Sequence, residues 1–258
     1  MRERKIKTFV DQKAFILGGS GLIGSEVIKV LTELGCKTYN LDIKKNNKEN
    51  DNYIKFDLTR GNIKKSYSKI INKFGLPDIF INCAYPKTSD WEDNNFSSIK
   101  LKSLKKNIEN HITNTSFLIR EVAECNKKKK KSCSIILLSS IYGLVGQDNS
   151  IYKGTDVTEN MTYSLIKSSI INFTKQMSSH YSRYGIRTNC VCPGGVYNEK
   201  LAKNLKYKKL LKNYSIRSPI GRMARPNEIA EPIVFLASNN SSYISGISLI
   251  VDGGWTAI

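Results

Sequence analysis

The sequence predicts an α/β fold in which a doubly wound parallel sheet carries helices on both faces. Short apolar runs typical of buried strands alternate along the chain with amphipathic patterns typical of helices. A glycine-rich turn stands between the first expected strand and the first expected helix. The chain has 258 residues and shows no internal repeat or linker, so we expect residues 1–258 to form one domain.

The first strand and the turn after it predict a dinucleotide-binding site. Residues 14–17 are apolar, and Gly18, Gly21 and Gly24 follow immediately before a helical pattern. Glycine tolerates positive φ and lets a pyrophosphate approach the backbone, where the helix N-terminus favours its negative charge. The cofactor contacts expected here are Gly18, Ser20, Gly21, Leu22, Ile23 and Gly24.

The second expected strand, residues 37–41, is followed by Asp42. A carboxylate in this place can accept hydrogen bonds from both adenosine-ribose hydroxyl groups, and it would repel a 2′-phosphate. This favours NAD over NADP as the cofactor. Lys44 and Lys45 follow closely and leave NADP open, and a solvated aspartate at a strand end is the structural alternative.

The formal net charge of +19 raises the question of a nucleic-acid partner. The lysines are spread along the chain, and the one dense run, Lys127–Lys131, falls between an expected helix and an expected strand. We interpret this run as a solvated turn, with a basic docking patch as the alternative. We therefore expect no nucleic-acid partner.

Other features of the composition favour a cytoplasmic protein without a metal site. No run approaches the ~20 apolar residues of a membrane span, and the N-terminus lacks a secretory apolar region. The six cysteines show no metal-ligand spacing and mostly stand in apolar, strand-like contexts. We interpret them as reduced core residues.

A candidate catalytic group lies in the middle of the chain. An apolar strand leads into Ser139 and Ser140, and Tyr163 and Lys167 follow in a helical pattern. Their spacing places the tyrosine and lysine side chains on one helix face, one turn apart. A phenol titrates at about pH 10, and a neighbouring ammonium favours the phenolate and lowers that pKa. The arrangement predicts proton transfer to or from a hydroxyl or carbonyl group.

Together with the glycine turn, these residues resemble the short-chain dehydrogenase/reductase family. The resemblance continues through residues 184–189 and 193–195 and extends over most of the chain. It implies a Rossmann-type fold and hydride transfer between NAD(P) and a secondary alcohol or ketone. It further implies that Tyr163 is the acid/base, that Lys167 lowers its pKa and holds the nicotinamide ribose, and that Ser140 orients the substrate oxygen.

The resemblance also implies further cofactor contacts. These are Asp57 and Leu58 at the adenine, Asn82 and Ala84 on the fourth strand, and Pro193, Gly194, Val196 and Asn198 near the nicotinamide. The chain departs from the family's pattern at Leu17, Cys83 and Tyr85. We interpret the first departure as a variation in the phosphate loop and not as the loss of the cofactor.

The family's fourth catalytic residue is an asparagine that holds a proton-relay water, and its match in this chain is unresolved. An alignment on the neighbouring apolar residues places it at Ile112. Asn110 and Asn114 each lie two residues away, on a different helix face unless the helix shifts or bulges. His111 is adjacent and could reach the cleft instead.

Residues 146–156 form an insertion between Ser140 and Tyr163 that would border the active site. It contains Tyr152, a false candidate for the base because Asp156 stands where the lysine is needed. Together with residues 82–86 and the C-terminal residues, the insertion resembles a bacterial subgroup associated with flagellin modification and surface-sugar biosynthesis, including legionaminic-type acids. This resemblance implies a sugar or sugar derivative as the substrate.

In this family the region 198–217 is the substrate lid. Here it holds seven lysine and arginine residues against one glutamate, which would suit an anionic sugar phosphate or nucleotide sugar. The alternative is a solvated face of a lysine-rich protein. The resemblance further implies a homodimer or homotetramer.

Two other functions stay open. The glycine spacing is nearer to that of the family's extended members, which suggests a sugar-nucleotide epimerase or dehydratase that retains its NAD. The short C-terminal portion disfavours this function. A non-catalytic NAD-binding module is the other alternative, and the complete serine, tyrosine and lysine set argues against it.

Overall fold

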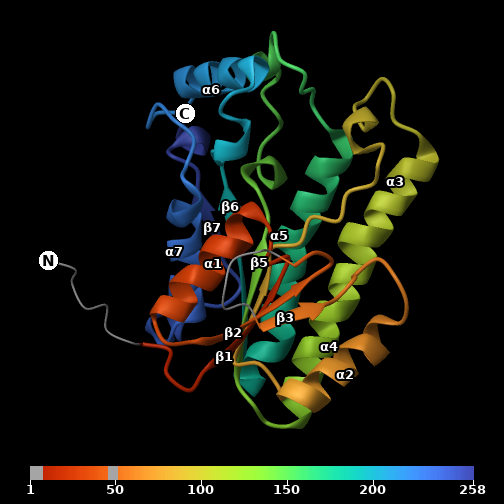
Figure 1. Ribbon diagram of the computed structural model, residues 1–258, viewed down its shortest axis with the longest axis vertical. Coiled ribbons are helices and arrows are strands. Elements are labelled where there is room, and N and C mark those ends of the chain that lie inside the picture. Colours follow the sequence, from red (N-terminus) through yellow and green to blue (C-terminus); the bar gives the residue numbers. More distant parts are fainter. Residues whose placement is uncertain (1–7, 46–51) are drawn as a thin grey trace, which may run out of the picture.

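The computed structural model describes residues 8–45 and 52–258, which form a parallel sheet with helices on both faces (Figure 1). The seven strands have the order β3-β2-β1-β4-β5-β6-β7, and all neighbours are parallel. The strands are β1 (Lys13–Leu17), β2 (Lys37–Asp42), β3 (Asn52–Lys55), β4 (Ile79–Asn82), β5 (Cys133–Leu138), β6 (Ile186–Pro193) and β7 (Ser248–Val251). The predicted doubly wound α/β fold is confirmed.

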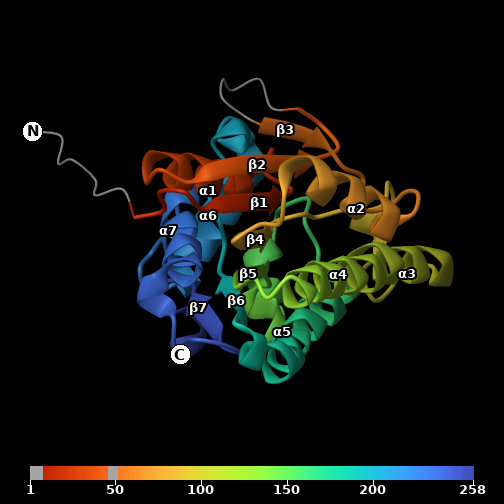
Figure 2. The same cartoon turned by 90° about the horizontal axis from the view of Figure 1, so that it is seen from below.

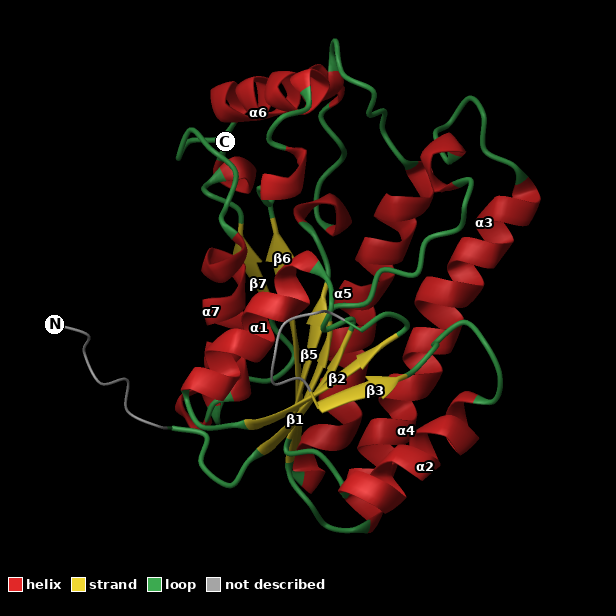
Figure 3. Ribbon diagram, viewed as in Figure 1, coloured by secondary structure: helices red, strands yellow, loops and turns green. Residues whose placement is uncertain are grey.

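Helices enclose the sheet on both sides, as Figure 3 shows. They are α1 (Leu22–Glu33), α2 (Ile63–Phe74), α3 (Leu101–Ile108), α4 (Asn114–Lys128), α5 (Met161–Tyr181), α6 (Leu205–Arg217) and α7 (Pro226–Ala237). α1 and α7 pack together on one face, while α2, α4 and α5 cover the other (Figure 2). α6 lies apart from both layers, beyond the carboxyl ends of the strands (Figure 1).

The alternation of side chains along each strand divides the core into two layers. In β1, Ala14 and Ile16 join the apolar cluster of α1 and α7, whereas Phe15 and Leu17 join the cluster of α2, α4 and α5. Successive strand residues point to opposite faces, and both faces are covered here. This double burial explains why the strands are continuous apolar runs in the sequence.

The direction of strand addition reverses between β1 and β4. From β1 the sheet grows through β2 to β3 on one side, and from β4 through β5 and β6 to β7 on the other. In open parallel sheets, ligands bind in the crevice outside the carboxyl ends of the strands at such a point.

The features expected of the surface and the cysteines can be located in the fold. Lys127–Lys131 connects the end of α4 to β5, as the sequence predicts. All six cysteines are free thiols. Among the helices of the described residues, none has the length and apolar character required to cross a bilayer.

A third, smaller apolar cluster lies beneath α6. It buries Ile141, Ile151, Tyr214, Met223 and Trp255. The rings of Tyr214 and Trp255 stack with their centroids 4.7 Å apart. This cluster joins the insertion to α6 and to the C-terminal segment.

We predict that Gly143→Ala destabilises the fold by about 1–3 kcal/mol, because a Cβ there would overpack the contact with α5. A Cβ at Gly143 would lie 2.7 Å from the backbone carbonyl carbon and oxygen of Lys167. Gly146→Ala is the matched control, since nothing lies within 4 Å of its added Cβ. Urea unfolding of both variants measures the difference, and equal stabilities would contradict the prediction.

Candidate active site

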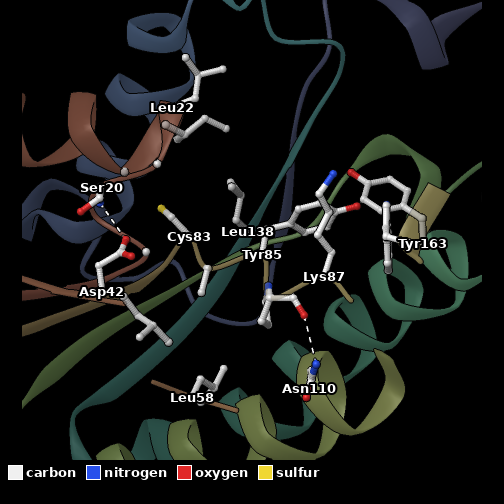
Figure 4. Close-up of a pocket in the computed structure, with 18 of the residues that line it drawn as sticks. Ser20, Leu22, Asp42, Leu58, Cys83, Tyr85, Lys87, Asn110, Leu138 and Tyr163 are labelled. Atoms are coloured by element: carbon white, nitrogen blue, oxygen red, sulfur yellow. Dashed lines mark hydrogen bonds between the residues drawn. The ribbon is translucent and has the colours of Figure 1, made fainter. Parts of the chain in front are cut away.

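A cleft of about 1060 Å³ opens at the carboxyl ends of the strands, where the sheet order reverses. The glycine turn and Asp42 lie at one end of it, and Tyr163 lies at the other, with Tyr85 between them (Figure 4). Most of the residues implied by the sequence line this cleft. They are Gly18, Ser20, Gly21, Leu22, Ile23, Gly24, Asp42, Asp57, Leu58, Ala84, Tyr163, Lys167, Pro193, Gly194 and Val196.

The glycine turn forms a narrow cradle at the start of α1. Gly18 has φ +77°, and a Cβ on it would lie 2.6 Å from the backbone nitrogen of Ala84. A Cβ on Gly24 would lie 2.3 Å from the carbonyl oxygen of Gly18. No side chain caps the N-terminus of α1, which begins after Gly21. Backbone N–H groups at an uncapped helix N-terminus fit a pyrophosphate, so these residues suit a dinucleotide.

Asp42 stands at the end of β2 and fixes the shape of the glycine turn. Its Oδ2 accepts a hydrogen bond from the Ser20 backbone N–H at 3.0 Å, and its Oδ1 accepts one from the Lys44 N–H at 3.2 Å. Lys44, Lys45 and Arg60 line the same end of the cleft. A carboxylate and several cations therefore share the region expected to meet the adenosine ribose.

The adenine pair implied by the resemblance also faces the cleft. Asp57 Oδ1 accepts hydrogen bonds from the backbone N–H of Thr59 at 2.9 Å and from its hydroxyl at 2.7 Å. Leu58 is buried beside it. These contacts fix the loop that follows β3.

Ser140 on the loop after β5 comes together with Tyr163 and Lys167 of α5. Asn160 caps α5, since its side-chain oxygen accepts a hydrogen bond from the Tyr163 N–H at 2.8 Å. The Ser140 hydroxyl is hydrogen-bonded to the Tyr163 phenol. The Lys167 Nζ lies 5.5 Å from the Tyr163 ring centroid and donates to the Leu138 carbonyl at 2.9 Å.

Ser139 lines the cleft, whereas Ser140 is not among the lining residues. The Ser139 hydroxyl donates to the Lys167 carbonyl at 2.7 Å, within a buried environment. It therefore ties the end of β5 to the middle of α5.

Burial has the largest effect on the pKa of the Tyr163 phenol, and the expected lowering of this pKa by Lys167 stays a prediction. Loss of water contact raises the pKa of the Tyr163 phenol to about 12, even though the hydrogen bond from Ser140 lowers it. Burial also lowers the pKa of the Lys167 ammonium to about 8. Desolvation disfavours the charged form of each group.

Two of the three relay candidates, Asn110 and His111, lie in a bulge of the helix. A π-helix spans Glu109–Thr113 between α3 and α4, and Asn110 lines the cleft. Asn110 Nδ2 donates to the Pro86 carbonyl at 3.3 Å (Figure 4). Its Oδ1 is buried and has no hydrogen-bond partner among residues 8–45 and 52–258. The wider turn of a π-helix changes which residues share a face, and this brings Asn110 to the cleft.

The other two relay candidates lie away from the cleft lining. His111 is buried against Tyr85 and Trp91, with ring centroids 5.2 and 5.5 Å away. Burial, followed by the charge of Lys167, lowers the pKa of His111 to about 3, so it is neutral at physiological pH. Asn114 is the first residue of α4 and does not line the cleft.

Two implied cofactor contacts are engaged elsewhere. Asn82 is buried at the end of β4, and its Oδ1 accepts a hydrogen bond from the Ala84 N–H at 3.1 Å. Asn198 Oδ1 accepts from the Lys200 N–H at 3.1 Å, and its own N–H donates to the Tyr207 hydroxyl at 2.7 Å. Neither is among the residues that line the cleft, so their contact with a cofactor stays a prediction.

Sequence reasoning missed several residues of the substrate end. Tyr142, Gln147, Thr158 and Asn160 line the cleft near Tyr163. Tyr152, set aside as a false base, lines it as well. Their position in the sequence could have identified them, because all five lie in or next to the insertion between Ser140 and Tyr163.

A family model described as Enoyl-(Acyl carrier protein) reductase matches residues 23–256. An uncharacterized oxidoreductase of Thermotoga maritima is 28% identical over 97% of this chain and 99% of its own length. L-rhamnose-1-dehydrogenase of Scheffersomyces stipitis is 29% identical over 71% of this chain and 66% of its own length. A solved short chain dehydrogenase of Leptospira borgpetersenii with bound NAD+ aligns at a TM-score of 0.84 and 29% identity, covering 96% of this chain and 94% of that one.

The chain belongs to the short-chain dehydrogenase/reductase family. The match spans most of its length, and the parallel sheet and the cleft have the form that this family requires. The protein is an enzyme, an NAD(P)-dependent oxidoreductase, and this sets aside the non-catalytic module.

We predict that the Tyr163 phenol stays protonated up to about pH 12 in the cofactor-free protein, because burial disfavours the phenolate. The difference in phenolate absorbance between wild type and Tyr163→Phe should show no titration step below about pH 10. Ser140→Ala should move the step to higher pH, since the Ser140 hydrogen bond lowers this pKa. A step near neutral pH would show instead that Lys167 dominates.

Proposed function

We propose that this enzyme transfers a hydride between NAD and a secondary alcohol or ketone of a sugar or sugar derivative, in surface-glycan or flagellin-glycan biosynthesis. The observation that carries the reaction is that Tyr163 and Lys167 line the end of the cleft opposite Asp42, with Ser140 hydrogen-bonded to the Tyr163 phenol. The proposal of a sugar draws on the subgroup resemblance and on the L-rhamnose-1-dehydrogenase relative.

The three side chains have distinct roles in this proposal. A bound nicotinamide cofactor supplies or accepts the hydride. The hydroxyl groups of Ser140 and Tyr163 donate hydrogen bonds to the substrate oxygen. In reduction the Tyr163 phenol gives its proton to that oxygen, and in oxidation it takes the proton back. The Lys167 ammonium, with a pKa of about 8, stabilises the phenolate left on Tyr163.

We further propose that Asn110 restores the proton to Tyr163 through a water. Its buried Oδ1 lacks a partner among the described residues, and a buried acceptor of this kind is normally satisfied. A water between Asn110 and Lys167 would satisfy it and lead toward solvent along the cleft. The assignment depends on the π-helix, a bulge that the sequence allowed but did not predict.

NAD is the cofactor we propose in preference to NADP. Asp42 would accept hydrogen bonds from the ribose hydroxyl groups and repel a 2′-phosphate. Lys44, Lys45 and Arg60 line the same region and would weaken that repulsion. The preference therefore depends on Asp42 alone.

The proposed substrate lid, residues 198–217, comprises α6 and the short helix before it. Its cationic residues would favour an anionic sugar phosphate or nucleotide sugar at the rim of the cleft. None of the residues that line the cleft comes from this segment. An anionic group would therefore bind outside the part of the cleft where Tyr163 lies.

We predict that Asp42→Ala raises the affinity for NADP(H) and weakens NAD(H) binding by about tenfold, the effect of losing one charge-assisted hydrogen-bond pair. Calorimetry with all four nucleotides measures this. Glu231→Ala, an exposed residue of α7, is the control and should bind as wild type does. Unchanged nucleotide preference in Asp42→Ala would contradict the role of this carboxylate.

We predict that Tyr163→Phe lowers kcat by about 10²–10⁴-fold, because the proton donor is lost while the ring remains. NADH binding should stay within twofold of wild type. The measurement is NAD-dependent oxidation of a panel of sugars and cyclic secondary alcohols. Tyr243→Phe, on a fully exposed side chain, is the matched control. Full turnover by Tyr163→Phe would overturn the catalytic assignment.

A further inference from the structure

The insertion, residues 146–156, together with the two residues that follow it, forms one wall of the cleft. This segment contributes Gln147, Tyr152, Val157 and Thr158 to the lining, whereas the proposed lid contributes none of the lining residues. At the Tyr163 end of the cleft, the insertion and not the proposed lid therefore supplies residues that would contact the non-reacting part of a substrate.

The insertion is fixed against α6 by polar contacts and by burial. Asn213 Nδ2 donates to the carbonyls of Ile151 at 2.9 Å and Lys153 at 3.0 Å. Arg217 Nε pairs with Asp148 at 3.3 Å. Ile151 is buried in the apolar cluster that also holds Tyr214 of α6. Asn213 and Arg217 of α6 thus hold the insertion in place. α6 lies beyond the carboxyl ends of the strands (Figure 1), where it contacts the short helix of the insertion.

Gln147 fixes the other side of the insertion to the start of α5. Its Nε2 donates to the Asn160 carbonyl at 2.8 Å and to the Ser164 hydroxyl at 3.0 Å. Its Oε1 accepts from the Asn160 backbone N–H at 3.1 Å. Since a backbone N–H can only donate, this contact sets which end of the Gln147 amide is the oxygen.

The orientation of the Gln147 amide determines whether the Tyr152 hydroxyl donates or accepts a hydrogen bond. Tyr152 Oη approaches Gln147 Oε1 at 3.5 Å, and an amide oxygen can only accept, so Tyr152 donates. The Tyr142 hydroxyl is hydrogen-bonded to Tyr152. The Tyr142 ring in turn lies 6.4 Å from the Tyr163 ring. With its proton directed to Gln147 and one lone pair taken by the Tyr142 hydroxyl, the Tyr152 oxygen can accept one more hydrogen bond, and Tyr152 lines the cleft.

We propose that Tyr152, supported by Tyr142, is a specificity residue that accepts a hydrogen bond from a substrate hydroxyl next to the reacting carbon. This inference rests on the proposed function and narrows its substrate to a ring that carries neighbouring hydroxyl groups. A phosphate or carboxylate is disfavoured at this position, because two acceptors would face each other. The rings of Tyr85 and Trp91 line the same part of the cleft and supply flat apolar surface for the ring.

The test compares cyclohexanol with cis- and trans-1,2-cyclohexanediol. Each diol carries one more hydroxyl group than cyclohexanol, on the carbon next to the first. Saturation-transfer NMR measures their binding in the presence of NADH, which allows no oxidation of an alcohol. Wild type should bind one diol about tenfold more tightly than cyclohexanol, the effect of one neutral hydrogen bond. Tyr152→Phe should remove this preference and leave cyclohexanol binding within twofold. Tyr142→Phe should weaken it, and Tyr243→Phe should keep it.

Equal binding of the diols and cyclohexanol by wild type, or no binding of either diol, would overturn the proposal. So would a preference that survives in both Tyr152→Phe and Tyr142→Phe. Oxidation of the panel of sugars and cyclic alcohols with NAD+ tests the proposed function separately. A diol preference without any turnover would overturn the proposed function and leave this specificity site standing, whereas turnover without a preference would overturn the site alone.

Discussion

The active site depends on two reciprocal hydrogen bonds between Lys167 and the end of β5. The Lys167 ammonium donates to the Leu138 carbonyl, and the Lys167 carbonyl accepts from the Ser139 hydroxyl. Gly143 lets the chain that follows pass directly against the same turn of α5. These contacts set the position of Tyr163, one turn earlier on the helix, relative to Ser140 on the loop after β5.

The same enclosure sets the electrostatics of the site. Burial is the largest influence on the Lys167 ammonium and lowers its pKa. Tyr163 is held in its neutral form by burial. Lys167, with a pKa of about 8, nevertheless keeps most of its positive charge at neutral pH. That charge can stabilise the negative charge left on Tyr163 when its proton is transferred.

The fold and much of the site could be predicted because they depend on local sequence patterns. Apolar strands, the glycine turn and the four-residue spacing of Tyr163 and Lys167 are each visible in a few neighbouring residues. Asn110 could not be chosen over Asn114, since a regular helix was the only available reference. The direction of the Tyr163 pKa shift and the fixing of the insertion by Asn213 depend on burial and on contacts between distant segments, which spacing does not record.

The π-helix determines how α3 and α4 are rotated relative to each other about the helix axis. One extra residue per turn advances the helix by about 100°. The faces that α3 and α4 present are therefore out of phase, although the backbone runs on without a break. Removing a single residue from Glu109–Thr113 would restore a regular helix and rotate every side chain of α3 relative to the sheet. The length of this short segment thus sets which face of α3 meets α5.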